Sequence, residues 1–527
     1  MKRIETDEAD RGVRGSCGTA RKARRFRVPG SVSLRISEVV LAAAILAGGC
    51  RFQRVPAHQA AAGVSYGVAA GEVTATSAIV WSRCDVDTDL TVTLQPVAGG
   101  EARVQRLHVD AAHDFTGVVR FDDLQPHTRY AYRAWCADQD APGTSAAAGR
   151  LQTAPAAIDP QAVRFIWSGD LGGQNVCRDR VEGYEIFDAM SAMHPDFFIA
   201  LGDMIYADNR CEPVASYGYE QIPGPPAPAT ALPAFWAIWR YNRADRRFQH
   251  FLASTSYYAV WDDHEIMDDS GPRRDELPQA PGVHLMPLAR EAFVDYQPML
   301  RTVDPPRLYR SARWGRHLEV FFLDTRSYRD RNDALDRPQA PKTMLGAAQR
   351  AWLLDALRDS DATWKVIVSS VPLSIPTGTT EGGRDGWANF DGDTGFEHEA
   401  LSLLRAMQQA RLRHLLWITT DVHFATGFRY RPFADDPAFL FYEFTTGPLN
   451  AGLFPTADLD PTLRPERLFR YGPANPRAID GFDEALPWFT FTVVDVDERG
   501  TLALRAVNGT GQTVFATKLD GAVTSDE

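Results

Sequence analysis

Five short apolar runs in this chain each lead into an acidic residue, and two of them also reach a histidine. A continuous apolar run of about four to eight residues is typical of a strand buried on both faces of a sheet. In open α/β sheets, ligands and reacting groups gather where such strands end. One acid after a strand is usually a helix cap or a solvated turn, but five in one domain indicate a site for hard metal ions. The runs are Phe165–Asp170, Phe197–Asp203, Tyr257–Glu265, Val320–Asp324 and Leu415–His423.

The size and composition of the chain favour a folded protein of two or three domains. Its 527 residues are 44% hydrophobic and 11% aromatic, which is enough to bury a large core. The formal net charge of −12 argues against a protein that coats nucleic acid, so we expect no nucleic acid as a stable partner. An anionic substrate would need local positive charge, supplied by bound metal ions and nearby arginines.

The start of the chain has the features of an export leader followed by a tether. Residues 11–35 are rich in Lys and Arg and contain no acid. The apolar stretch Val39–Gly49 is too short to span a membrane, which takes about 20 residues, but it suits a signal peptide. It ends at Cys50 in a pattern that resembles a bacterial lipoprotein cleavage site, so lipidation of Cys50 would tether the protein to a membrane. We predict a leader over 1–50, a tether over 51–63, and export to the periplasm or cell surface.

Four further cysteines fall in pairs within two regions of the chain. Cys84 and Cys136 lie in the first region, and Cys177 and Cys211 lie in the second. Even numbers in each region suit two disulfides in an oxidising compartment, which agrees with export. Four buried free thiols are the alternative.

Two regions of different pattern follow the tether. Residues 64–154 contain short alternating strands separated by turn residues, and the run Leu124–Trp135 resembles a corner of a fibronectin type III sandwich. Over 160–520, strands alternate with amphipathic helical segments, which indicates a layered α/β domain. We expect the strands from Trp488 onward to complete the second sheet of this domain. A proline-rich insertion over 221–233 either covers the site or is a plain surface loop.

The acids, a phenol and an imidazole offer the ligands that hard or intermediate metal ions prefer. Asp203 is followed three residues later by Tyr206, and Asp421 and His423 share one face of an extended chain. Oxygen-rich ligands with a few imidazoles suit Fe, Mn, Mg or Ca, and they do not suit a zinc centre built on thiolates. A bridging carboxylate can hold two such ions about 3.5–4 Å apart, and the pair would clamp a phosphate and activate water.

The order of these motifs resembles that of the metallophosphoesterases, and of the PhoD-type alkaline phosphatases in particular. The likeness is carried by Asp170-Leu-Gly, Gly202-Asp-Met-Ile-Tyr, Trp261-Asp-Asp-His-Glu, Leu323-Asp-Thr-Arg-Ser-Tyr-Arg and Asp421-Val-His. Each motif is weak alone, but their order and spacing over residues 64–520 are specific. The resemblance implies a small N-terminal β-sandwich followed by a layered α/β/β/α metallophosphoesterase domain, which is the fold class we expect.

The resemblance also assigns ligands around two cations. These would be Fe³⁺ and Ca²⁺, with Mn²⁺, Mg²⁺ or Zn²⁺ as alternatives. Asp203 would bridge the ions, and Tyr206 would bind the ferric ion as phenolate beside Asp170 and His423. The alternative for Tyr206 is an ordinary packed aromatic side chain.

The second, calcium-like ion would be bound by Asp421 and by Asp263 or Asp268. These two acids are candidates for the place where the family usually has an asparagine. Several members present a cysteine as the first ligand, where this chain has Asp170. The histidine that the family has after the strand at Val366–Ser370 is missing, because this chain offers only serines there. We therefore expect Asp324 to substitute as a ligand.

Two residues are predicted to act on the substrate. His264 would donate a proton to the leaving oxygen or orient it, and Arg326 would hold a phosphate oxygen bidentately. The alternatives are structural, since His264 could cap a turn or pair with Glu265, and Arg326 could pair with Asp324.

We therefore predict an exported metal-dependent phosphoesterase of the PhoD-like alkaline phosphatase type. It would hydrolyse small phosphate mono- and/or diesters by attack of a metal-activated water or hydroxide. Two other functions stay open. One is a phosphodiesterase or phospholipase-type enzyme that acts on lipid or cell-wall polymers, and the other is a non-catalytic surface protein that binds through its sandwich domain.

Overall fold

The computed structural model describes residues 63–137, 146–272, 274–301, 307–379 and 381–519. The predicted leader over 1–50, Cys50 itself, and the predicted tether up to residue 62 lie outside these residues. In the described part of the chain, no helix has the length and apolar character needed to cross a membrane.

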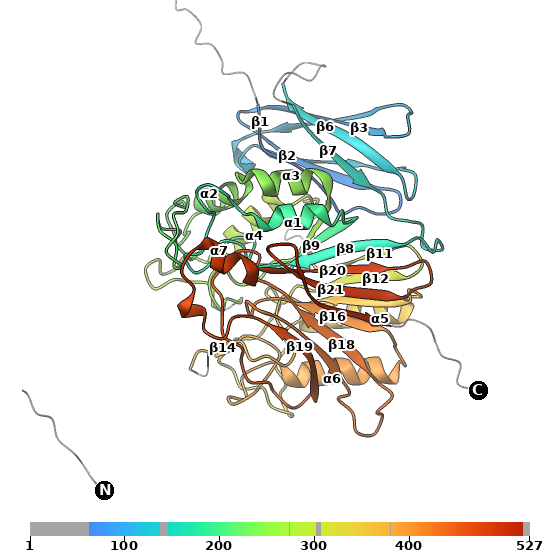
Figure 1. Cartoon of the computed structure of the whole chain (residues 1–527), viewed down its shortest axis with the longest axis vertical. Coiled ribbons are helices and arrows are strands. Elements are labelled where there is room, and N and C mark those ends of the chain that lie inside the picture. The colour runs from blue at the N-terminus through green and yellow to red at the C-terminus, as the bar shows by residue number, and fades with distance from the viewer. Residues whose placement is uncertain (1–62, 138–145, 273, 302–306, 380, 520–527) are drawn as a thin grey trace, which may run out of the picture. The chain divides into compact units, whose positions relative to one another are not determined.

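The first seven strands form a β-sandwich, as the alternating pattern predicts (Figure 1). One sheet has the strand order β4-β3-β6-β7, and β1, β2 and β5 face it. The disulfide between Cys84 in β2 and Cys136 in β6 joins the two sheets, so this predicted pair is confirmed. The strands are β1 (Val64–Gly71), β2 (Ala78–Cys84), β3 (Thr88–Pro96), β4 (Arg103–Val109), β5 (Thr116–Phe121), β6 (Arg129–Cys136) and β7 (Ala147–Gln152).

One sheet of the sandwich continues into the large domain. Its strand order is β22-β21-β20-β8-β9-β10-β1-β2-β5, in which β1 pairs in parallel with β10 at Gly71 and Tyr257. Only glycine fits at Gly71, because a Cβ there would lie 2.4 Å from the carbonyl oxygen of Tyr257. The strands of the large domain in this sheet are β8 (Val163–Ser168), β9 (Phe197–Ala200), β10 (Ser256–Ala259), β20 (Thr490–Val496), β21 (Leu502–Asn508) and β22 (Thr513–Leu519).

The C-terminal strands correct one expectation from the sequence. β20 pairs antiparallel with β8, so β20–β22 extend the first sheet instead of completing the second. The second sheet has the order β11-β12-β13-β16-β18-β17-β19, and its central strands β12, β13, β16 and β18 are parallel. Its members are β11 (Arg310–Trp314), β12 (Leu318–Phe322), β13 (Trp364–Val368), β16 (Leu415–Thr419), β17 (Ala425–Tyr430), β18 (Phe441–Thr445) and β19 (Pro465–Tyr471).

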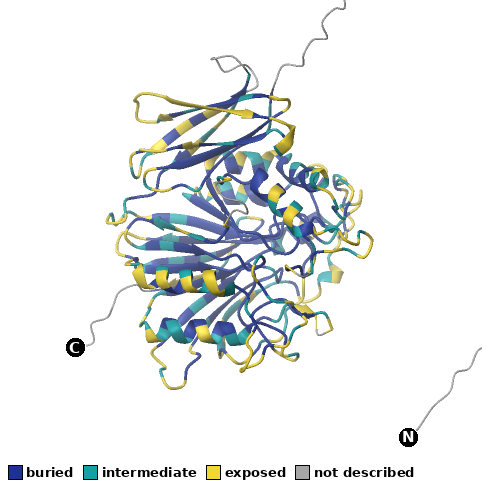
Figure 2. Ribbon diagram, turned by 180° about the vertical axis from the view of Figure 1, so that it is seen from behind, coloured by how far each residue is buried: buried dark blue, intermediate teal, exposed yellow. Residues whose placement is uncertain are grey.

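Alternate residues of the buried strands point into different layers. In β8, Phe165 and Trp167 belong to a core shared with Val320 of the second sheet, whereas Ile166 belongs to the core beneath the first group of helices. Helices on the outer faces present exposed residues to solvent, while the strands between them are largely buried (Figure 2). The first group comprises α1 (Ile186–Ala192), α2 (Leu232–Arg243), α3 (Arg246–Ser254) and α4 (Leu285–Tyr296); α5 (Gly346–Asp359) and α6 (Glu397–Gln409) pack on the second sheet.

The order of layers is therefore helices, sheet, sheet, helices, preceded by a sandwich. This confirms the predicted fold class, and it brings the carboxyl ends of parallel strands from both sheets to one edge of the domain.

Candidate metal centre

Most of the candidate ligands line one cavity next to the ends of strands from both sheets. β8, β9 and β10 of the first sheet precede Asp170, Asp203 and Asp262, and β16 of the second sheet precedes Asp421. The cavity has a volume of about 320 Å³. The acidic and imidazole side chains that line it are Asp203, Asp263, His264, Asp268, Asp269, Asp385, Asp421 and His423.

Four of the predicted ligands adopt a left-handed backbone conformation that non-glycine residues rarely use. Their φ angles are 62° at Asp170, 51° at Asp203, 78° at Asp421 and 56° at His423. Each such residue costs about 1–3 kcal/mol and persists only where the surrounding structure enforces it. The recurrence of this backbone conformation at four predicted ligands indicates that the turns after these strands are shaped by function.

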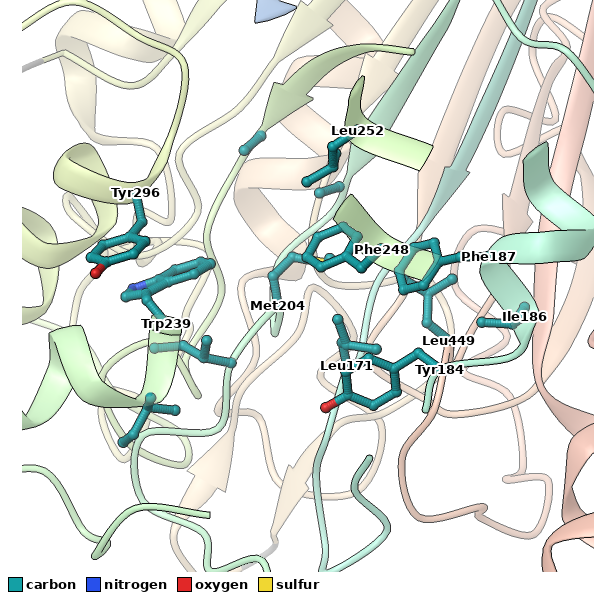
Figure 3. Close-up of a cluster of buried hydrophobic side chains, with 14 of the residues drawn as sticks. Leu171, Tyr184, Ile186, Phe187, Met204, Trp239, Phe248, Leu252, Tyr296 and Leu449 are labelled. Carbon is teal, nitrogen blue, oxygen red and sulfur yellow. The ribbon is translucent and has the colours of Figure 1, made fainter. Parts of the chain in front are cut away.

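Core packing enforces this geometry in the first sheet. Leu171 follows Asp170 and Met204 follows Asp203, and both apolar side chains are buried against residues of the first helical layer (Figure 3). Asn242 Nδ2, from α2, donates to the carbonyl oxygens of Leu171 at 3.1 Å and Met204 at 2.8 Å. The two carboxylates are therefore held by turns that are tied to each other and to the core.

Asp170, Tyr206 and His423 converge beside the cavity. Tyr206 Oη lies 3.0 Å from His423 Nε2, which lies 3.6 Å from Asp170 Oδ1. His423 Nδ1 donates a hydrogen bond to the carbonyl oxygen of Gly452, so Nε2 carries the free lone pair and faces the other two side chains. Burial lowers the pKa of His423 to about 3, so the imidazole is neutral and able to bind a cation.

Asp263 belongs to three overlapping groups of potential ligands. Within each group the ligand atoms lie within 4.8 Å of one another. One carboxylate shared among several groups has the arrangement of a bridge between cations. The three groups pair Asp263 with Asp203 and His264, with Asp262 and Asp421, and with Asp269 and Asp385.

These carboxylates lie too close together for all of them to ionise easily. Burial, and then nearby carboxylates, raise the pKa of Asp170 to about 7. Burial raises the pKa of Asp262 to about 6, and burial together with Asp385 raises that of Asp269 to about 7. Burial and neighbouring acids also raise the pKa of Asp421 well above its usual range. A bound cation would remove this penalty by favouring the charged forms.

Unpartnered oxygens show that the cluster fits cations. Among the described residues, one buried carboxylate oxygen on each of Asp170, Asp262, Asp263, Asp324 and Asp421 accepts no hydrogen bond, although that of Asp263 lies 3.4 Å from Arg326 Nη2. A buried anionic oxygen without a partner costs several kcal/mol, so such groups pair with charges or coordinate metals. The donor set of carboxylates, one phenol and one imidazole suits hard or intermediate ions.

His264 lines the cavity and is oriented by a carboxylate from the neighbouring loop. Its Nδ1 lies 2.8 Å from Asp208 Oδ1, and its Nε2 lies 3.8 Å from Asp268 Oδ1. Burial opposes protonation, but the charges of Asp208 and Asp263 outweigh it and raise the pKa of His264. Glu265 does not pair with His264, because it accepts from the backbone N–H groups of Asp203, Met204 and Asp262.

The PhoD-like phosphatase model matches residues 165–494, and the model of the PhoD-like phosphatase N-terminal domain matches residues 49–155. The chain belongs to the PhoD-like phosphatase family. The predicted resemblance is thereby confirmed. Alkaline phosphatase D of Bacillus subtilis (strain 168) is 24% identical over 396 residues, which are 68% of this chain and 64% of that protein.

Solved structures agree on the fold of this chain. A structure of PhoD superposes with a TM-score of 0.67 at 18% identity, over 87% of this chain and 93% of the other. The purple acid phosphatase PPD1 from seeds of yellow lupin (Lupinus luteus) has a TM-score of 0.56 at 13% identity, over 86% of this chain and 74% of the other. Both likenesses support the metallophosphoesterase fold.

Arg326 does not have the place that we predicted for it. Its side chain is fully buried, and its guanidinium binds Asp262 through Nε at 2.5 Å and Asp385 through Nη1 at 2.8 Å and Nη2 at 2.7 Å. It also lies 3.4 Å from Asp263. A guanidinium saturated by buried acids cannot clamp a phosphate, so Arg326 is a structural residue. Its guanidinium pairs with Asp262 and Asp385, whereas Asp324 accepts from its backbone N–H at 3.2 Å.

Two other predicted metal ligands do not join the groups of potential ligands. Asp324 does not line the cavity, because its Oδ1 accepts from Trp261 Nε1 at 2.9 Å and from the backbone N–H groups of the turn that follows β12. Asp268 lines the cavity, but its side chain is 70% exposed and it joins none of the three-residue groups found among the described residues. Asp269, instead of Asp268, lies beside Asp263. The positions of Asp170, Asp203, Tyr206, Asp263, Asp421 and His423 agree with a shared site, and their roles as ligands stay predictions.

Sequence reasoning missed two residues of the site. Asp385 follows no apolar strand and lies in a loop with polar and glycine neighbours, so no local pattern distinguishes it. Asp208 lies five residues after Asp203, and only its contact with His264 shows that it belongs to the site. The second predicted disulfide, between Cys177 and Cys211, is present and joins the loops that follow Asp170 and Asp203.

Proposed function

We propose that this chain is an exported metal-dependent phosphoesterase that hydrolyses phosphate mono- and/or diesters. One observation carries the proposal: acids from both sheets, a phenol and a neutral imidazole meet at one cavity although they are far apart in the sequence. Membership of the PhoD-like phosphatase family supports the same reaction class.

The residues of the site fit two or more cations, and we propose Fe³⁺ and Ca²⁺, with Mn²⁺, Mg²⁺ or Zn²⁺ as alternatives. Asp170, Tyr206 and His423 would hold one cation. Asp421 and acids of the Trp261-Asp-Asp-His-Glu motif would hold another cation, with Asp203 or Asp263 between the two. When bound, the cations would supply Lewis acidity and lower the pKa of a water molecule so that it can attack phosphorus.

The chain's own residues would bind the ester and move the proton. Among the described residues that line the cavity there is no Lys or Arg, and Arg274 Nη1 lies 3.5 Å from the lining residue Asp269, so the cations would compensate most of the phosphate charge. His264 lines the cavity, with its Nδ1 held by Asp208 and its Nε2 3.8 Å from Asp268 Oδ1. His264 would therefore deliver a proton to the leaving oxygen from Nε2.

We further propose that the protein works outside the cytoplasm. Two disulfides, Cys84–Cys136 and Cys177–Cys211, support an oxidising compartment. A lipidated Cys50 would then hold the enzyme at a membrane surface, near substrates there.

The test combines metal analysis with turnover of two chromogenic esters. Purified protein should contain bound metal and should hydrolyse 4-nitrophenyl phosphate, bis(4-nitrophenyl) phosphate or both; the ratio of the two rates separates a phosphatase from a phosphodiesterase. Asp203→Ala should lose metal and at least about 10³-fold in kcat/KM while circular dichroism stays unchanged. Asp355→Ala, at an exposed acid of α5, is the control. Near-normal turnover by the Asp203 variant would refute the proposed function.

A further inference from the structure

The cavity also has apolar lining residues, here called the apolar wall, in addition to its acidic side chains. Ile375, Pro376, Phe424, Phe454 and Pro455 line the same cavity as the candidate metal ligands. A ligand site lined by both charged and apolar groups can fix a charged group while accepting an organic one.

Phe454 is the prominent member of this wall. Its ring stacks on the imidazole of His423, with ring centroids 4.3 Å apart and an angle of 12° between the planes. The residue is nevertheless 39% exposed, so part of its ring surface is free. An aromatic ring held against a candidate metal ligand, with surface left open at the cavity, is placed to contact the organic group of a bound phosphate ester.

The backbone that leads to Phe454 is fixed before any ligand binds. Gly452 N–H donates to Gln174 Oε1 at 3.2 Å, and Leu453 N–H donates to Tyr217 Oη at 2.7 Å. The carbonyl oxygen of Gly452 accepts the hydrogen bond from His423. Little conformational entropy is therefore lost when a ligand packs on the ring.

We propose that Phe454 determines substrate specificity, by packing against an apolar group esterified to the phosphate. This rests on the proposed phosphoesterase function. The cavity favours such substrates because its apolar lining gains from burial of the apolar surface of the ester. The substrate class is a phosphate ester of an apolar, preferably aromatic, alcohol.

Two esters of primary alcohols separate this contact from the chemistry. Benzyl phosphate and glycerol 3-phosphate have leaving groups of similar type, and only the first carries an apolar ring. Metal-loaded wild-type protein should prefer benzyl phosphate in kcat/KM. Phe454→Ala should lower kcat/KM for benzyl phosphate about tenfold, with an effect of about twofold or less on glycerol 3-phosphate, because a lost aromatic contact is worth about that much. Phe454→Tyr, which keeps the ring, should restore the preference.

Phe390→Ala is the matched control. Phe390 is 38% exposed, close to the value for Phe454, and it does not line the cavity. Equal losses on both esters with Phe454→Ala would mean that the ring acts only by bracing His423, and would overturn the proposal. A wild-type enzyme without preference for the benzyl ester would also overturn it.

A binding measurement keeps the test independent of turnover. The affinities of metal-loaded protein for phenylphosphonate and methylphosphonate are compared by calorimetry, for wild type and Phe454→Ala. A preference for phenylphosphonate that the variant loses supports the proposal even if no ester is hydrolysed, which would contradict the proposed function alone. Equal affinity of the wild type for the two phosphonates overturns the proposal for Phe454.

Discussion

Arg326 and Asp385 form a bidentate ion pair beneath the cavity, with Nη1–Oδ1 and Nη2–Oδ2 distances of 2.8 and 2.7 Å. Asp385 also accepts from Arg329 Nη1 at 2.5 Å and from Asn332 Nδ2 at 2.7 Å. Burial opposes ionisation of Asp385, but the two arginines outweigh it and hold its pKa well below the usual range. The pair therefore fixes a permanently charged carboxylate next to Asp263 and links the loop after β12 to the site.

We expect Arg326→Ala to act through stability and metal retention. Removing one partner of a buried ion pair leaves uncompensated charge and typically costs about 3–5 kcal/mol. Urea unfolding should show a loss of this size, and metal analysis should show reduced retention because Asp262 and Asp385 lose their anchor. Arg331→Ala, at an exposed pair with Asp333, is the control and should cost about 1 kcal/mol or less. Full stability with a raised KM for phosphate esters would instead support the original prediction that Arg326 binds substrate.

The raised pKa values of the cluster predict how pH acts on metal-free protein. The pKa is raised to about 7 for Asp170 and Asp269 and to about 6 for Asp262, whereas an unfolded Asp has a pKa of about 4. Between these values the three carboxyls bind more protons in the folded state, whereas His423, with its lowered pKa, binds fewer. The three carboxyls outweigh the one imidazole, so the free energy of unfolding falls as pH rises from about 5 to about 8. Bound metal displaces those protons, so metal affinity rises over the same interval.

This dependence is measured by urea unfolding after chelation and again after metal is restored. The metal-free protein should lose about 2 kcal/mol or more between pH 5 and pH 8, since one unit of pKa shift corresponds to about 1.4 kcal/mol. Asp170→Asn should flatten the curve, because it removes one of the titrating groups. A metal-free protein that becomes more stable over this interval would show that the carboxylates are not crowded as described.

The two disulfides provide a matched pair for testing how the site is held. Cys177–Cys211 closes a loop that contains Asp203 and Tyr206, and Cys177 Sγ lies 3.3 Å from the carbonyl oxygen of Gly172. Cys84–Cys136 lies in the sandwich, away from the cavity residues. Removal of either pair by double Cys→Ser substitution should cost about 2–4 kcal/mol in unfolding free energy.

Metal retention should distinguish the two variants. Without Cys177–Cys211, the turns after Asp170 and Asp203 are free to separate, so we expect at least about tenfold weaker metal binding by competition with a chelator. The variant without Cys84–Cys136 should bind metal as the wild type does. Equal affinities in the two variants would show that core packing at Leu171 and Met204 is sufficient to hold the ligands.

The sequence predicted the strands of the site better than the contacts of its charged side chains. Buried parallel strands leave a continuous apolar run, and Asp170, Asp203 and Asp421 follow such runs directly, so their common edge could be inferred. Asp324 also follows such a run directly, and Arg326 comes two residues later, yet neither side chain lines the cavity. Nothing local shows that the guanidinium is neutralised by Asp385, which comes from a loop 59 residues away.

The continuation of the sandwich into the large sheet could not be predicted either. The pairing of β1 with β10 depends on the close approach of Gly71 and Tyr257, which lie far apart in the sequence. A glycine in a strand indicates close contact with some other backbone, but it does not identify which one. In the same way, the run from Trp488 is apolar enough for either sheet, and only its pairing with Phe165 and its neighbours decides between them.

Asp208 offers a test of the role of His264 that does not remove the imidazole. Its Oδ1 lies 2.8 Å from His264 Nδ1, and its Oδ2 accepts from the backbone N–H of Asp268 at 2.9 Å. Burial opposes its ionisation, but the charge and hydrogen bond of His264 outweigh this and lower the pKa of Asp208 to about 2.

Asp208→Asn keeps the shape of the side chain while removing the charge that favours the imidazolium form of His264. If His264 protonates the leaving oxygen, the variant should lose about 10- to 100-fold in kcat on poor leaving groups such as benzyl alcohol, and much less on 4-nitrophenol, which departs without a proton. The limb of the pH–rate profile that reports His264 should move to lower pH, because its protonated form is less favoured. Equal losses on both leaving groups, with an unmoved limb, would mean that Asp208 and His264 only support the loop that carries Asp263.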